Sequence, residues 1–196
     1  LGNYINGEAT FDYFGISAAI NASGNIIAGG AYHNDGINGY NSGHVRVYEY
    51  IAGVWTQLGN DIDGEAPDDR CGWSVSLNNS GYRVAVGSPQ NDGNGYNSGS
   101  ARVYDWNGSS WSQVGSDING EAVGDHSGNS VSLNASGNIL AVGAIYNQDN
   151  GSNSGHVRVY EYIGNSWVQM GGDIDGEAAI DESARSISLD SVGHKI

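Results

Sequence analysis

Acidic side chains recur in pairs along this chain, at a spacing that suits the binding of a cation. The motif Gly-Glu-Ala-x-x-Asp occurs four times, and its carboxylates form the pairs Glu8/Asp12, Glu65/Asp69, Glu121/Asp125 and Glu177/Asp181. Ca²⁺ takes carboxylate and carbonyl oxygens in flexible geometry, so each pair is a candidate calcium site. The alternative, which we favour, is that these acids cap and brace their loops and pair with a recurrent arginine.

A second polar loop of the repeat offers candidates for ligand binding. Its acids are Asp35, Asp92 and Asp149, and its tyrosines are Tyr40 and Tyr96. The Asn-Asp-Gly runs resemble part of a calcium loop, but they lack the spaced acids and the terminal Glu of an EF-hand. We favour Gly-rich turns held by hydrogen bonds from the Asn and Asp side chains. The tyrosines could stack on a sugar ring or pack their own loop, and the sequence leaves both open.

Three of the seven basic residues occupy one position of the repeat, at Arg46, Arg102 and Arg158. Each stands in an expected strand, where a half-buried guanidinium needs a carboxylate or carbonyl partner. We therefore predict a structural ion pair between each arginine and an acid of the Gly-Glu-Ala-x-x-Asp motif. His44 and His156 lie two residues before an arginine, but no second histidine accompanies them, so we do not predict a zinc site there.

The repeats carry no nucleophile–base arrangement. The motif Gly-x-Ser-x-Gly is absent, and no histidine recurs in every unit. Paired carboxylates leave glycoside hydrolysis open by residue type alone. Near-identical units nevertheless argue against an active site, which needs unlike residues, and divergence is confined to stretches such as 67–71 and 180–184. We predict that the chain is not an enzyme.

The motif spacing defines the architecture. The Gly-Glu-Ala triplets begin at residues 7, 64, 120 and 176, which gives a period near 56 residues. Each unit holds four short stretches with the alternation of β-strands; in the second unit they are 74–77, 83–86, 101–106 and 111–114. Four strands in a repeat of about this length predict an all-β fold, a β-propeller of four-stranded antiparallel blades. The first strand carries small residues, which suits the innermost position of a blade.

About three and a half blades fit the 196 residues. We treat 1–196 as one array with units at 1–57, 58–113, 114–169 and a partial unit at 170–196, in which 186–196 repeats the first two strands. Closed propellers use about four to eight blades. We therefore expect a fragment of a larger propeller, seven blades being one arrangement, with the remaining blades supplied by the parent chain or another chain.

Several separated elements resemble the FG-GAP repeat of integrin-alpha-type propellers. They are Phe14-Gly15 followed by Ser17, the Ala28-Gly-Gly-Ala31 stretch, the Gly43–Tyr48 strand, and Ala85-Val-Gly-Ser-Pro89. The resemblance covers every unit and implies a propeller that binds partners through its long loops. In that family an Asp-rich calcium loop often joins the first two strands. Here that loop is Asn21-Ala-Ser-Gly24, Asn78-Asn-Ser-Gly81 or Asn134-Ala-Ser-Gly137, and none of these three has a carboxylate. The family's calcium site is therefore not carried over.

Composition narrows the range of functions. The formal net charge is −15, which argues against nucleic acid and against anionic membranes as partners. No apolar run is long enough to span a bilayer, so we expect no membrane insertion. Little lysine together with abundant Asn, Gly, Ser and Tyr suggests an extracellular or cell-surface location.

Three functions compete at this point. The first is an extracellular adhesion or binding module that recognises a glycan or protein through its long-loop face, with Ca²⁺ as a candidate cofactor. The second is a structural repeat or spacer of a large surface protein. The third is a secreted glycan-active enzyme. We rank them in this order because loops on a rigid scaffold usually carry function.

Overall fold

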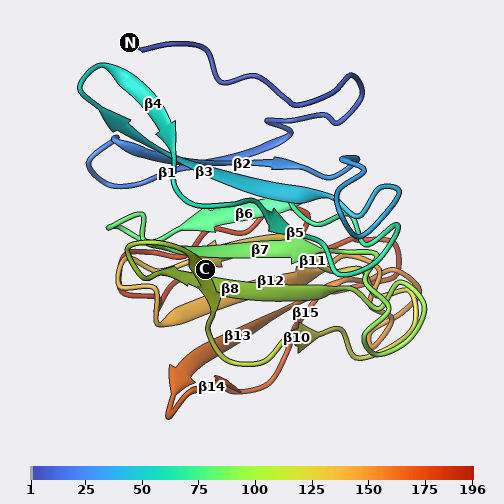
Figure 1. Ribbon diagram of the computed structural model, residues 1–196. Coiled ribbons are helices and arrows are strands. Elements are labelled where there is room, and N and C mark those ends of the chain that lie inside the picture. Colours follow the sequence, from blue (N-terminus) through green and yellow to red (C-terminus); the bar gives the residue numbers. More distant parts are fainter. Residues whose placement is uncertain (1) are drawn as a thin grey trace.

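The computed structural model describes residues 2–196, which form three antiparallel sheets stacked side by side (Figure 1). Each sheet is one blade built on four consecutive strands, as expected for a β-propeller. The first blade holds β1 (Ser17–Ile20), β2 (Ile26–Ala31), β3 (His44–Ile51) and β4 (Val54–Gln57). The second holds β6 (Ser74–Leu77), β7 (Arg83–Ser88), β8 (Ser100–Trp106) and β9 (Trp111–Gln113). The third holds β11 (Ser127–Leu133), β12 (Ile139–Ala144), β13 (His156–Ile163) and β14 (Ser166–Gln169).

Each blade also has a short fifth strand, which the expected four strands per unit did not include. These strands are β5 (Ile62–Asp63), β10 (Ile118–Asn119) and β15 (Ile174–Asp175). In the first blade β4 pairs with the end of β3, whereas β5 pairs with its beginning, opposite His44 and Val45. The chain therefore returns along the third strand of its blade, and this return brings the Gly-Glu-Ala motif beside the buried arginine.

Small residues allow the first strands of neighbouring blades to approach closely. The Ser17 hydroxyl donates to the Gly72 carbonyl over 2.7 Å, and the Ser74 hydroxyl donates to the Gly128 carbonyl over 2.8 Å. A Cβ at Gly87 would lie 1.9 Å from the Gly128 carbonyl oxygen, so no larger residue fits there. The contacts of β6 with β1 and β11 agree with the innermost position expected for these strands.

Apolar side chains from adjacent blades form the core. Val45 and Val47 of β3 and Val84 and Val86 of β7 are almost fully buried in one cluster between the first two blades. The indole nitrogen of Trp111 donates to the Leu58 carbonyl over 2.8 Å, which ties the outer edge of the second blade to the first. The alternation of apolar residues along each strand thus serves packing between blades on both faces.

The last unit differs from expectation. The stretch 186–196 was expected to repeat two strands, but no strand lies within it; a turn closed by Gly193 donating to Asp190 is present. Its docking is nevertheless repeat-like, because the Leu189 amide donates to the Ser132 hydroxyl. Residues 2–196 contain no third strand of this last unit, so its second stretch has only its first stretch to pair with.

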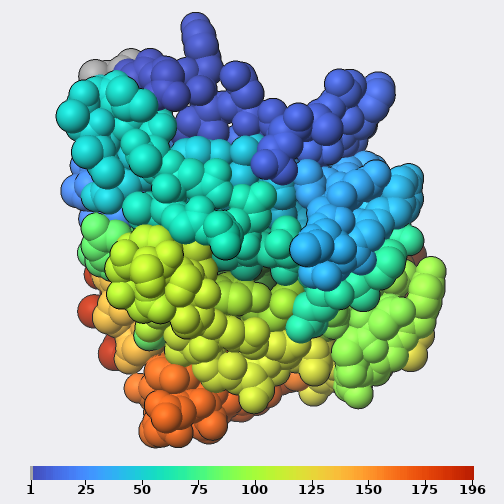
Figure 2. Space-filling model, viewed as in Figure 1, coloured from blue at the N-terminus to red at the C-terminus, as the bar shows by residue number. Residues whose placement is uncertain are grey.

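Long and short loops lie on opposite faces, because antiparallel strands alternate in direction. The long connections that follow the second and fourth strands gather at the right of Figure 1, and the short turns lie at the left. Figure 2 shows the long loops of the first two blades as separate lobes on that side. Among residues 2–196 no helix has the length and apolar character needed to cross a bilayer.

Candidate functional site

The aspartates of the Gly-Glu-Ala-x-x-Asp motif hold their own loops in place. Asp69 is buried, and its Oδ2 accepts hydrogen bonds from the backbone amides of Glu65 and Ala66 and from the Asn91 side chain, over 3.0 to 3.1 Å. Asp12 and Asp125 repeat this pattern with Asn34 and Asn147. Asp181 accepts the Ala178 amide. Because N–H donors already point at these oxygens, the geometry favours bracing over calcium binding.

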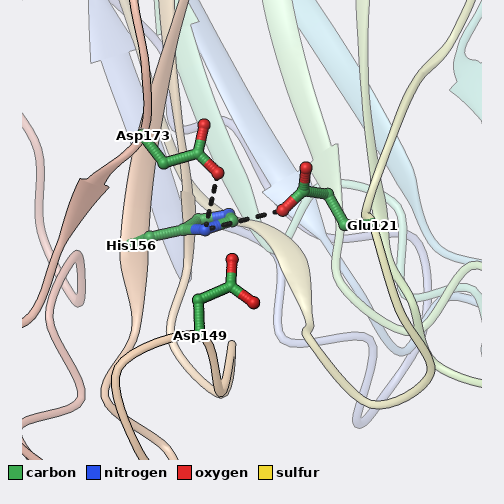
Figure 3. A group of neighbouring side chains, drawn as sticks. All are labelled: Glu121, Asp149, His156 and Asp173. Carbon is green, nitrogen blue, oxygen red and sulfur yellow. Dashed lines mark ion pairs between the residues drawn. The ribbon is translucent and has the colours of Figure 1, made fainter.

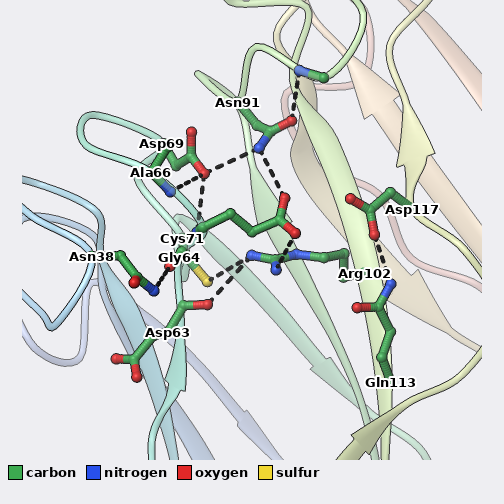
Figure 4. A network of polar contacts seen from close by, with 12 residues as sticks. Asn38, Asp63, Gly64, Ala66, Asp69, Cys71, Asn91, Arg102, Gln113 and Asp117 are labelled. Carbon is green, nitrogen blue, oxygen red and sulfur yellow. Dashed lines mark hydrogen bonds and ion pairs between the residues drawn. The ribbon is translucent and has the colours of Figure 1, made fainter.

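The recurrent arginines are buried and reach back toward the preceding blade. Arg102 Nη1 lies 3.3 Å from Glu65 Oε1, and Nη2 lies 3.5 Å from the Asp63 carbonyl (Figure 4). The corresponding ion pairs join Arg46 to Glu8 over 3.8 Å and Arg158 to Glu121 over 3.3 Å. Each arginine therefore links the third strand of its own blade to the connection that enters that blade. Glu177 lies in the last unit, which contributes no third strand within residues 2–196.

The loop residues proposed as ligand contacts lie at the rim and do not converge. Tyr40 and Tyr96 are 65% and 70% exposed at the tips of separate loops. Asp35 accepts the Asn41 amide and Asp92 accepts the Asn97 amide, so both carboxylates close their own turns. Asp149 differs, because it lies in a group with Glu121, His156 and Asp173.

One position of the repeat combines unusual backbone geometry with side chains that differ from unit to unit. It is the residue directly after the bracing aspartate, and it has a positive φ without being glycine: Tyr13 (56°), Arg70 (57°), His126 (55°) and Glu182 (47°). Residues with a Cβ rarely adopt this region, and such strain persists where the surroundings enforce it, often at functional sites. The backbone enforces it here: the Arg70 amide donates to Asn41, and its carbonyl accepts from Trp73.

Aromatic rings line up beside this position between the first two blades. Tyr32 stacks on Tyr13 with ring centroids 5.7 Å apart, and it meets Trp73 edge-on at 4.8 Å. His33 packs against Tyr32 at 4.3 Å. The Arg70 guanidinium lies 5.8 Å from the centre of the Tyr32 ring, which continues the row toward the third blade.

A cavity of about 190 Å³ continues this row between the second and third blades. Its lining includes Arg70, Trp73, Gln90, His126, Asn129 and Tyr146. We call the aromatic row and this cavity together the inner cleft, formed by Tyr13, Tyr32, His33, Arg70, Trp73, Gln90, His126, Asn129 and Tyr146. The Nε atom of Arg70 is buried and has no hydrogen-bond partner among residues 2–196. A ligand oxygen in the cavity would supply the missing acceptor.

Electrostatics give the inner cleft one fixed positive charge in an acidic protein. Burial, aided by the Arg70 charge, holds the pKa of His126 below its usual value. Burial and Arg70 act in the same direction on the pKa of His33. Both rings therefore favour the neutral form, which can donate and accept hydrogen bonds, while arginine stays charged. The cleft can stack a flat apolar face, hydrogen-bond hydroxyl groups and pair with one anion.

The repeat pattern concealed this site. Near-identical units were expected to lack convergent unlike residues, but the few divergent positions converge in the inner cleft. Arg70 falls in the divergent stretch 67–71, and this divergence was the available signal. Trp73 gave no sign of its proximity to His126 and Tyr146, because it comes from the unit before theirs.

The class of protein follows from the fold: the chain is a β-propeller repeat module with four-stranded blades. The FG-GAP repeat model matches residues 62–104 and 119–160, so these two segments are FG-GAP repeats. Repeats of this family are typical of extracellular proteins and are generally non-catalytic.

Two further comparisons add little. No curated protein matches the chain. Among solved structures, the Kuenenia stuttgartiensis hydrazine synthase is similar, with 11% sequence identity and a TM-score of 0.48. The match covers 81% of this chain and 36% of that one, so the chain spans about a third of the other's length. No property of that enzyme is carried over.

Proposed function

We propose that this chain is an extracellular binding module that recognises a glycan in its inner cleft. The observation that carries the proposal is the row of strained positions after the bracing aspartates. Glycine would be the least costly residue there, yet the chain has Tyr13, Arg70 and His126. Tyr13 stacks on Tyr32, and Arg70 and His126 line the cavity. The positive φ, which disfavours any residue with a Cβ, recurs at this position in every unit, although the side chain differs from unit to unit. This pattern is expected when each of these side chains contacts a ligand.

The chemistry of the cleft favours a sugar among the ligands considered. Small-molecule sites combine apolar and aromatic walls with a few placed polar groups. Trp73 and Tyr32 offer aromatic faces for a sugar ring, and Gln90, Asn129 and the neutral histidines offer hydrogen bonds for hydroxyl groups. Arg70 adds a charge that a carboxylate-bearing sugar would pair with.

The experiment is a fluorescence titration of the 196-residue chain with two oligosaccharides. Galacturonate hexamers carry a carboxylate on every sugar, and cellohexaose carries none. We expect saturable binding of the galacturonate hexamer and at least tenfold weaker binding of cellohexaose. Trp73→Ala should abolish binding, whereas the matched control Tyr96→Ala, at the loop rim, should leave it unchanged.

The two variants also separate the inner cleft from the loop rim. Binding that survives Trp73→Ala and disappears in Tyr96→Ala would move the site to the loop tips. Absence of saturable binding to either sugar would favour the structural-repeat function. That alternative has its own support, because the braces at Asp12, Asp69 and Asp125 and the arginine ion pairs recur in all three blades.

A further inference from the structure

A histidine and three carboxylates meet at the junction of the second and third blades (Figure 3). His156 Nδ1 lies 3.5 Å from Asp173 Oδ2 and 3.9 Å from Glu121 Oε2. Asp149 completes the group from the long loop of the third blade, and one ligand atom from each residue lies within 4.8 Å of the others. The four residues come from three separate segments, so only the fold brings them together.

The histidine at the centre of this group has no other role. Its side chain is 1% exposed, and neither ring nitrogen has a hydrogen-bond partner among residues 2–196. A buried polar group without a partner is costly and calls for an explanation. Figure 3 shows Nδ1 directed toward the carboxylates of Asp173 and Glu121. A cation bound between them would give that nitrogen a partner.

The surrounding residues hold the carboxylates in position for coordination. The Gln169 side chain donates to Asp173 Oδ1 over 2.6 Å, which leaves Oδ2 facing the histidine. Arg158 lies 3.3 Å from Glu121 Oε1, which leaves Oε2 facing the same way. Such outer contacts are usual around metal ligands. Three carboxylates and one guanidinium leave two negative charges, which match a divalent cation.

The ligand types select the metal. An imidazole nitrogen beside carboxylate oxygens suits Zn²⁺ and related transition metals, whereas Ca²⁺ takes oxygen ligands. Tetrahedral Zn²⁺ with bonds of about 2.0–2.1 Å places its ligand atoms about 3.4 Å apart. The separations of 3.5 and 3.9 Å need only a small contraction to reach that value.

The other two blades vary this arrangement. In the first blade His44 Nδ1 lies 3.3 Å from Asp61 Oδ2 and 3.8 Å from Glu8 Oε2, and within residues 2–196 no further acid joins this group of three. In the second blade Glu65 and Asp117 are retained and Ser100 replaces the histidine. The repeat thus contains a four-ligand site, a three-ligand site and a position without the nitrogen ligand.

We propose that Glu121, Asp149, His156 and Asp173 bind a divalent transition-metal ion of the Zn²⁺ type, and that Glu8, His44 and Asp61 form a second, weaker site. An ion at either place would join the connection entering a blade to the third strand of that blade. The site is separate from the inner cleft and does not rest on the proposed function.

The test is calorimetric titration of the metal-free chain with ZnCl₂, with CaCl₂ as the comparison. We expect one tight and one weaker Zn²⁺ site per chain, and no more than weak heat from Ca²⁺. His156→Ser should weaken the tight site at least a hundredfold, and His44→Ser should remove the weaker one. Serine already occupies this position in the second blade, so the fold accommodates the change.

Two matched pairs complete the design. Gln169→Leu should weaken the tight site tenfold or more, whereas the equivalent Gln113→Leu in the second blade should change nothing. Ser100→His should add a third, weak site beside Glu65 and Asp117. Titration with CoCl₂ gives a second readout, because the visible absorption of four-coordinate cobalt should disappear in His156→Ser. An unchanged Zn²⁺ isotherm in His156→Ser, or equal affinity for Ca²⁺, would overturn the proposal.

Discussion

The strained backbone at Arg70 can be tested with two substitutions that differ only by a Cβ atom. Arg70→Gly and Arg70→Ala both remove the guanidinium and its contact with Tyr32, so these losses cancel when the variants are compared. The backbone hydrogen bonds to Asn41 and Trp73 are retained in both. At φ 57° a Cβ costs about 1–2 kcal/mol, whereas glycine loses about 0.5–1 kcal/mol more entropy on folding.

The glycine variant should therefore be more stable than the alanine variant by about 0.5–1 kcal/mol. For a chain of this size that difference corresponds to roughly 1–4 °C in melting temperature. Urea denaturation would measure it, with Gln90→Gly and Gln90→Ala as the control pair, because Gln90 is not among the positive-φ residues. There alanine should be the more stable by about 0.5–1 kcal/mol. An alanine variant of Arg70 at least as stable as the glycine variant would refute the strain argument.

Three further predictions concern titration and inter-blade contacts. The folded state holds the pKa of His126 below its usual value, so the unfolded state takes up more protons as pH falls through about 6.5. The stability of the protein should therefore decline as pH falls through this range. Thermal melts of the His126→Asn variant should show a less steep decline. Arg102→Met should lower the free energy of unfolding by about 1 kcal/mol, as measured by urea denaturation; this figure is kept small because Glu65 is half exposed to solvent. An unchanged free energy of unfolding would contradict a stabilising ion pair. Trp111→Phe should cost about 1 kcal/mol by removing the bond to the Leu58 carbonyl, and an unchanged midpoint would assign the indole to packing alone.

The sequence determined the blade and its repetition. The alternation of side chains predicted the strand bounds closely. The strand expected at 74–77 is observed with the same bounds, and the strand expected at 83–86 is two residues longer, ending at Ser88. Small residues in the first strand, such as Ser17 and Ser74, predicted its inner position, because only small residues allow neighbouring blades to approach. The pairing of Arg102 with an acid of the motif was likewise an expectation, and the structure brings Arg102 and Glu65 within 3.3 Å. These features depend on local pattern and on the period, both of which a single sequence carries.

Tertiary structure alone decided where the unlike residues meet. The short strand β5 was missed, because two residues carry no alternation and pair only where β4 has left the edge of β3. His156 was judged without metal partners from its neighbours in sequence, yet Glu121 and Asp173 reach it from segments on either side of the blade. Arg70 and Tyr146 line one cavity from different blades. Such proximities arise from how the blades stack, and spacing within one repeat does not specify which residues of the next repeat lie opposite.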